Sequence, residues 1–151
     1  MIPADTSPGP ALPPVSAPQV SAAQTVARVL LGAALIFAGV GHLTFARQGF
    51  QAQVPKSLPL DPDFVVLASG VVEIGLGGAI ALLPRFRVPL GWVSAAFFAA
   101  VFPGNIVQYL NHADSLGLDT DRARGIRLLF QPLLMLWALW STGAWPRRER
   151  R

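Results

Sequence analysis

Long apolar stretches alternate with polar connections along this chain of 151 residues. The clearest stretch is 64–83, FVVLASGVVEIGLGGAIALL, in which Ser69 and Glu73 are the only polar side chains. Twenty residues of α-helix rise about 30 Å, roughly the thickness of the hydrocarbon core of a bilayer. The stretch lacks the polar stripe that a helix on the surface of a soluble protein carries. It is therefore predicted to be a membrane span with a carboxyl group near its middle.

Three further apolar stretches predict spans at about 26–45, 88–110 and 126–145. The expected fold is all-α: a polytopic membrane protein, a bundle of four transmembrane helices within residues 25–146. Prolines at 55, 59 and 62 argue against a regular helix in the connection 46–63. Pro103 lies inside the third span and is expected to weaken or kink it. Residues 84–87 and 111–125 are expected to be loops.

The two ends of the chain differ from its middle in composition. Residues 1–24 hold six of the 14 prolines and few large apolar side chains, which predicts a disordered tail. Residues 147–151, RRERR, form a basic tail. Over the whole chain 52% of residues are hydrophobic and 13% are charged, about half the charged share of a soluble protein. The composition thus agrees with a membrane protein.

The distribution of basic residues predicts the orientation of the spans. With four spans, seven of the 12 basic residues lie on the side of the two termini and five on the other. Because cytoplasmic segments are enriched in Lys and Arg, both termini are expected in the cytoplasm. The basic residues cluster at the ends of apolar runs, and this distribution also argues against a nucleic-acid partner.

Each predicted span carries polar side chains toward the same leaflet. His42 ends the first span and Glu73 lies in the middle of the second. Asn105 lies in the outer part of the third, while Arg127 and Gln131 begin the fourth. These five residues predict a buried pocket that opens to the outer face, with Glu73 and His42 as candidates for catalysis and the other three as ligand-binding groups. The alternative is that they only form hydrogen bonds between helices, as in many bundles without a ligand.

Other classes of site are not indicated. The chain has no cysteine, and two histidines, His42 and His112, are too few and wrongly spaced for a metal site. The glycines of GLGG at 75–78 are assigned to helix packing, because no strand precedes them as a nucleotide-binding loop would require.

Six segments in order carry a family resemblance: GVGHLTF (39–45), VPKSLPLDP (54–62), SGVVEIGLGG (69–78), LLPRFR (82–87), VFPGNIVQYL (101–110) and RLLFQPLLMLWALW (127–140). The chain resembles the DoxX-like family of small bacterial membrane proteins, departing from its pattern at Leu43 and Gly104. The resemblance implies a four-helix membrane bundle. Relatives are associated with thiosulfate:quinone oxidoreductase subunits and with membrane complexes that handle oxidative stress.

The leading functional hypothesis combines the polar pocket with this resemblance. The chain is expected to be a subunit or quinone-facing partner of a membrane redox complex rather than a stand-alone enzyme. Glu73 and His42 would exchange protons, and electrons would come from a protein partner because the chain has no ligands for a redox centre of its own. A small-solute or proton-coupled transporter and a structural or assembly subunit without a ligand remain the alternatives.

Overall fold

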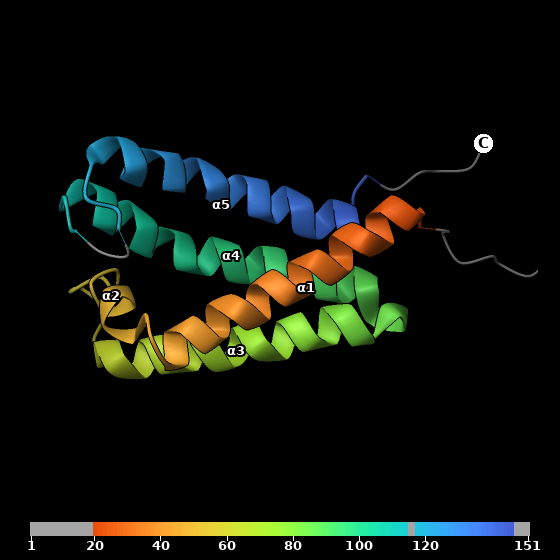
Figure 1. The fold of residues 1–151 in the computed structure, drawn as a ribbon, viewed down its shortest axis with the longest axis horizontal. Coiled ribbons are helices and arrows are strands. Elements are labelled where there is room, and N and C mark those ends of the chain that lie inside the picture. Colours follow the sequence, from red (N-terminus) through yellow and green to blue (C-terminus); the bar gives the residue numbers. More distant parts are fainter. Residues whose placement is uncertain (1–19, 115–116, 147–151) are drawn as a thin grey trace, which may run out of the picture.

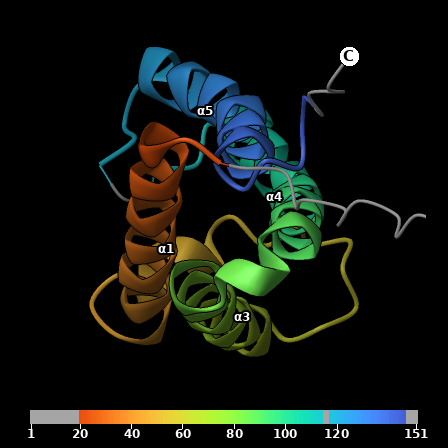
Figure 2. The same ribbon diagram turned by 90° about the vertical axis from the view of Figure 1, so that its right-hand side faces the viewer.

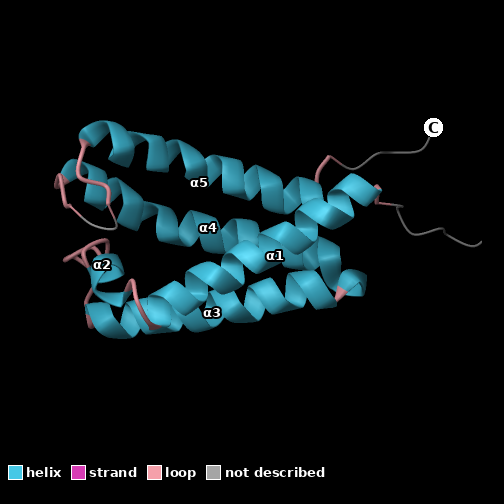
Figure 3. Cartoon of the chain, in the orientation of Figure 1, coloured by secondary structure: helices cyan, strands magenta, loops and turns pink. Residues whose placement is uncertain are grey.

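The computed structural model describes residues 20–114 and 117–146, in which every regular element is a helix (Figures 1 and 3). These are α1 (Ala22–Leu43), α2 (Arg47–Gln51), α3 (Pro62–Leu82), the 3₁₀ helix η1 (Pro84–Phe86), α4 (Arg87–Leu110) and α5 (Asp121–Ser141). Three helical segments are long and apolar enough to cross a membrane: Ala22–Leu43, Pro62–Leu82 and Pro84–Leu110. The prediction of an all-α chain is therefore confirmed, and three of the four predicted spans have the length and composition that a membrane span needs; α5, the fourth, is not among them.

The four long helices begin and end close to the predicted spans, with several corrections. Helix α1 begins at Ala22, because Ser21 accepts a hydrogen bond from the backbone N–H of Gln24 and caps the helix. Residues 22–24 therefore belong to α1 and not to the predicted tail. Of that tail, residues 1–19 lie outside the described part of the chain, as do 147–151. Helix α5 begins at Asp121 behind its N-cap Thr120, so the polar loop ends earlier than predicted.

Two predicted loops contain short helices. The connection 46–63 holds α2, which lies before the three prolines and so escapes their effect. The predicted loop 84–87 forms the 3₁₀ helix η1 and the first residue of α4. Helix α4 continues through Pro103 without a break, although the proline removes one backbone N–H from the helix.

The long helices surround a common interior (Figure 2). Helix α1 packs mainly on α3, and α4 packs mainly on α5. Both described ends of the chain lie at the end of the molecule opposite α2 (Figure 1). The molecule is thus made of two helical hairpins, α1–α3 and α4–α5, which η1 joins.

Glycine pairs bring α1 and α3 together. A Cβ atom on Gly77 would lie 2.5 Å from the carbonyl oxygen of Gly32, and one on Gly39 would lie 2.6 Å from that of Gly70. Such close approach is the packing that small residues allow in membranes, and it confirms that the face of α3 bearing Glu73 is a packing face. Gly75 and Gly78 have no atom within 4 Å of an added Cβ, so Gly77 alone of the GLGG glycines packs against a neighbour.

Polar side chains are buried and large apolar ones are exposed. In the described residues, eleven buried side chains are polar or charged and eight are hydrophobic. Phe37, Phe45 and Leu82, by contrast, are each more than two-thirds exposed. A soluble protein would show the reverse preference, whereas apolar surface is stable against lipid.

Arg28 is one of the buried charges. Its guanidinium donates to the carbonyl oxygens of Ile80 and Ala81, the latter at 3.3 Å. These carbonyls belong to the last turn of α3, where four carbonyls lack partners within the helix and the helix dipole favours a cation. Arg28 therefore caps α3 from the neighbouring helix.

Candidate functional site

A cavity of about 630 Å³ lies between the two hairpins at the α2 end of the molecule. Its walls are mostly apolar, with side chains such as Leu31, Leu35 and Phe98. Seven polar residues also line it: His42, Gln53, Ser69, Glu73, Asn105, Arg127 and Gln131. All five residues singled out from the sequence are thus brought to one cavity, together with two that were not proposed as site residues.

His42 and Glu73 form the ionisable pair of the cavity. Nδ1 of His42 lies 2.9 Å from Oε2 of Glu73 and also 2.9 Å from the carbonyl oxygen of Ala38. The Ala38 carbonyl can only accept, so the hydrogen bond to it places a hydrogen on Nδ1, directed at Ala38 in the same helix. Oε2 of Glu73 consequently receives no hydrogen bond of good geometry although it is buried. The pair is a close electrostatic contact with an unused carboxylate oxygen, not a fully formed hydrogen bond.

The segment that follows α1 covers the His42 side of the cavity. The Phe50 ring stacks on the His42 imidazole, with ring centroids 3.6 Å apart and an interplanar angle of 15°. Asp63 at the start of α3 holds α2 in place, accepting hydrogen bonds from Arg47 Nε and Gln51 Nε2, both at 2.6 Å. The Phe50 ring stacked on the His42 imidazole limits the approach of water to His42.

Arg127 is the centre of a network that joins α4, α5 and the segment after α2. Its Nε donates to Asn105 Oδ1 at 3.1 Å, and one terminal nitrogen donates to Gln53 Oε1 at 3.1 Å. Asn105 Nδ2 donates in turn to Gln131 Oε1 at 3.0 Å, and Gln131 Nε2 donates to the Phe98 carbonyl at 2.6 Å. Because the buried amides of Asn105 and Gln131 are hydrogen-bonded in this way, they keep one orientation and fix that of the Arg127 guanidinium.

Glu73 has His42 and not Arg127 as its contact partner. No ion pair within 4 Å joins Glu73 to Arg127 among the contacts of the described residues, so their charges attract each other only across the cavity. The carboxyl group and the guanidinium lie on different hairpins, α3 and α5. The cavity therefore has an acid–imidazole side and a guanidinium–amide side.

Phe50 and Gln53 are functional candidates that the sequence did not reveal. Both fall in the 46–63 connection, which lacks the helical periodicity that places a side chain on a face. The one available signal is that Gln53 immediately precedes the proline-rich run that begins at Val54. Ser69 was recognised only as a small packing residue beside Glu73.

The fold and the cavity define a helical protein with three helices long and apolar enough to span a membrane and with an internal polar site. A family model described as "Domain of unknown function (DUF8561)" matches residues 31–142, and the chain belongs to that family. The matched range includes every residue that lines the cavity, from Leu31 to Leu134. Comparisons with curated proteins and with solved structures found no match.

Proposed function

We propose that this chain is a DoxX-like protein of the bacterial inner membrane in which four helices, α5 included, span the bilayer. In this arrangement the cavity opens toward the outer leaflet and receives the head group of a membrane quinone. The chain would be the quinone-facing subunit of a redox complex. The observation that supports this most is that one largely apolar cavity contains an acid–imidazole pair and an oriented guanidinium–amide network.

The polar atoms that lack partners fit a quinone head group. Gln53 Nε2 is a buried donor without an acceptor, and Glu73 Oε2 is a buried acceptor without a well-formed hydrogen bond. A buried polar atom left unsatisfied costs about 1–3 kcal/mol, so a ligand that pairs with such atoms gains affinity. Quinone carbonyls accept hydrogen bonds, and quinol hydroxyls donate them, so the two redox forms match the donor and the acceptor respectively.

The residues divide into two roles in this proposal. Arg127, Asn105 and Gln131 orient the head group, while Glu73 and His42 exchange protons with it. Reduction of a quinone to a quinol consumes two electrons and two protons. A redox centre of a partner subunit supplies the electrons, and the Glu73–His42 pair passes the protons one after the other.

The alternatives are less well supported by the geometry. A proton-coupled transporter would be favoured by a helix broken at the site, yet α4 is continuous through Pro103. A structural subunit without a ligand would be expected to fill its interior, because interiors are close-packed and voids lose contacts. A cavity of about 630 Å³ is within the range of small-molecule sites.

The test is whether the purified protein binds quinone. Protein extracted in a neutral detergent should retain quinone in about equimolar amount, identified by mass spectrometry of the organic extract. A short-chain quinone should rebind after delipidation, and Gln131→Leu should weaken it about tenfold or more. Met135→Leu, one turn further along α5, conserves volume outside the cavity and serves as the control. Failure of the wild-type protein to retain or rebind quinone would refute the proposal.

A further inference from the structure

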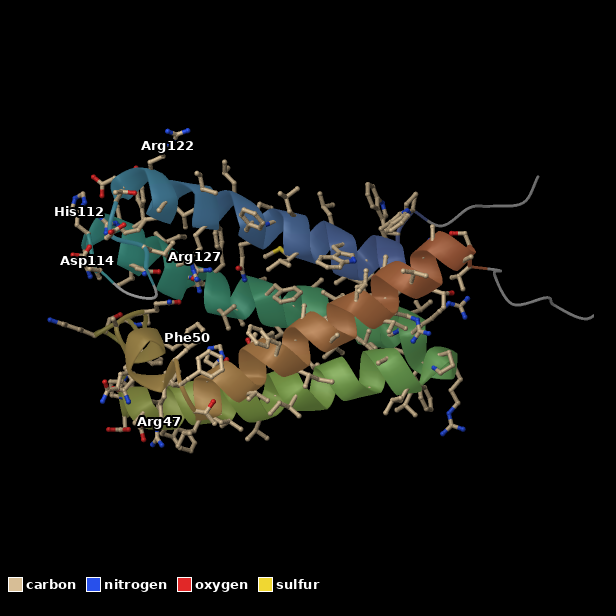
Figure 4. All side chains as sticks on the ribbon, in the orientation of Figure 1. Arg47, Phe50, His112, Asp114, Arg122 and Arg127 are labelled. Carbon is tan, nitrogen blue, oxygen red and sulfur yellow. The ribbon has the colours of Figure 1, made fainter. Side chains whose placement is uncertain are left out.

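Arg127 is a cation whose described partners are all neutral. Its two hydrogen bonds go to the amide oxygens of Asn105 and Gln53. No carboxylate lies within 4 Å of its guanidinium in the described chain. Arg127 and Phe50 point into the same space between α5 and α2, whereas Arg122 in the same helix points outward (Figure 4). Glu73 attracts the guanidinium across the cavity without contacting it. A guanidinium with no counter-ion in contact is costly in an apolar cavity, and a bound anion would offset that cost.

Gln53 supplies a second, independent indication of a bound anion. Its Oε1 accepts from Arg127, which leaves Nε2 as a buried donor with no acceptor, and the side chain is only 9% exposed. A guanidinium and an amide N–H on one side of a cavity are the donors that an oxyanion accepts from. Glu73, the acid of the cavity, makes no contact with Arg127 within 4 Å and so does not fill this place.

The rest of the wall is apolar over a length that no small inorganic ion would occupy. Aliphatic and aromatic side chains continue from the network along the cavity, among them Leu134, Leu35 and Val66. Burial of each methylene group of a ligand against such a surface favours binding, because it removes apolar area from water. The ligand that suits both parts therefore has a charged head and a hydrocarbon chain.

We infer that the Arg127–Gln53 side of the cavity is a subsite for the oxyanion head group of an amphiphile, a carboxylate or a phosphate on an alkyl chain. The inference rests on the cavity being a ligand site, as the proposed function requires. It adds a second ligand class, because a quinone is neutral and gives the guanidinium of Arg127 no anion in contact. The anionic amphiphile and the quinone occupy the same cavity and compete for it.

The experiment uses decanoate, decanol and decyl phosphate as probes of the full-length protein in neutral detergent. Decanoate and decanol share the alkyl chain and differ in charge. Decanoate should bind in titration calorimetry and raise the melting temperature, while decanol should bind at least tenfold more weakly. Tighter binding of decanoate than of decyl phosphate would identify a free carboxylic acid as the ligand, and the reverse would identify a lipid phosphate. Equal binding of decanoate and decanol would overturn the inference.

Two variants test whether decanoate binding depends on the charge of Arg127. Arg127→Gln should weaken decanoate about ten- to hundredfold, because it removes a charged donor. Arg122→Gln, an exposed arginine of the same helix, should leave binding unchanged. If Arg127→Gln does not fold, the contrast between decanoate and decanol on the wild-type protein still decides. Titration of a short-chain quinone in parallel separates the two proposals: quinone bound without decanoate refutes only the oxyanion subsite, and decanoate bound without quinone refutes only the redox function.

Discussion

Glu73 is a buried carboxyl group whose nearest ionisable neighbour is His42, and the exchange Glu73→Gln tests its role. The amide keeps the shape of the side chain but cannot ionise. Under the proposed function the variant should fold as the wild type does in detergent, while a strain that depends on this chain should lose growth under oxidative or sulfur-compound stress. Wild-type growth together with wild-type folding would leave Glu73 with a purely structural role. Glu73→Leu should be more harmful, since it also crowds the glycine-packed face of α3.

Asp121 gives the residue-scale prediction for pH. Arg124 donates a hydrogen bond to its carboxylate at 2.7 Å and His112 Nδ1 lies 2.6 Å away, and these two contacts hold the pKa of Asp121 below its ordinary value. The unfolded chain therefore binds the proton more readily. This contribution to stability is present above about pH 4 and is lost as the pH falls through the lowered pKa.

Asp121→Asn should consequently flatten the fall in melting temperature between about pH 5 and pH 3. The effect should be small, because the side chain is more than half exposed and solvent screens it. Asp119→Asn, an exposed acid of the same loop, is the control. Melting curves of Asp121→Asn that fall with acid as steeply as those of the wild type would contradict the prediction.

At the scale of elements, the close contact of α1 and α3 depends on glycine at particular positions. Gly77→Ala would place a methyl group 2.5 Å from the carbonyl oxygen of Gly32, so the helices must separate. Overpacking of this kind costs about 1–3 kcal/mol, and the melting temperature should fall. Gly78→Ala meets no atom within 4 Å and should stabilise α3 by about 0.5–1 kcal/mol. Equal effects of the two neighbouring substitutions would show that the glycine pairs do not set the helix separation.

The long helices were predictable from the sequence, and the reasons lie in particular residues. Twenty-residue apolar runs have one stable form in lipid, and caps such as Ser21 and Thr120 fix where helices begin. The close approach of the Gln53 backbone to Gly104 in α4 was not predictable, because it is a tertiary contact between a loop and a helix that no local pattern encodes. The polar residues within the predicted spans identified the cavity residues that lie on the long helices. Phe50 and Gln53 escaped notice because a loop side chain acquires its direction from contacts that no periodicity encodes.

At the scale of the whole molecule, the position of the chain ends predicts the topology. The start of α1 and the end of α5 lie together, opposite α2 and the loop after α4 (Figure 1). If all four long helices span the bilayer, reporters fused at Ser16 and after Arg151 should both report the cytoplasm. A reporter inserted between Asp114 and Asp121 should report the exterior. The reverse pattern would show that the count of seven against five basic residues gives the wrong orientation.

The turn η1 has a consequence for how the chain can be divided. It is three residues long and joins two hairpins, each of which makes most of its packing internally. The cavity, by contrast, takes walls from both. A gene cut within Pro84–Phe86 should therefore yield two half-proteins that insert independently and reassemble in the membrane when expressed together. Pull-down of one half with a tag on the other checks the assembly, and quinone or decanoate should bind only to the reunited halves. Halves from two related proteins can be combined by the same route. Each hybrid then pairs the acid–imidazole side of one protein with the guanidinium–amide side of the other.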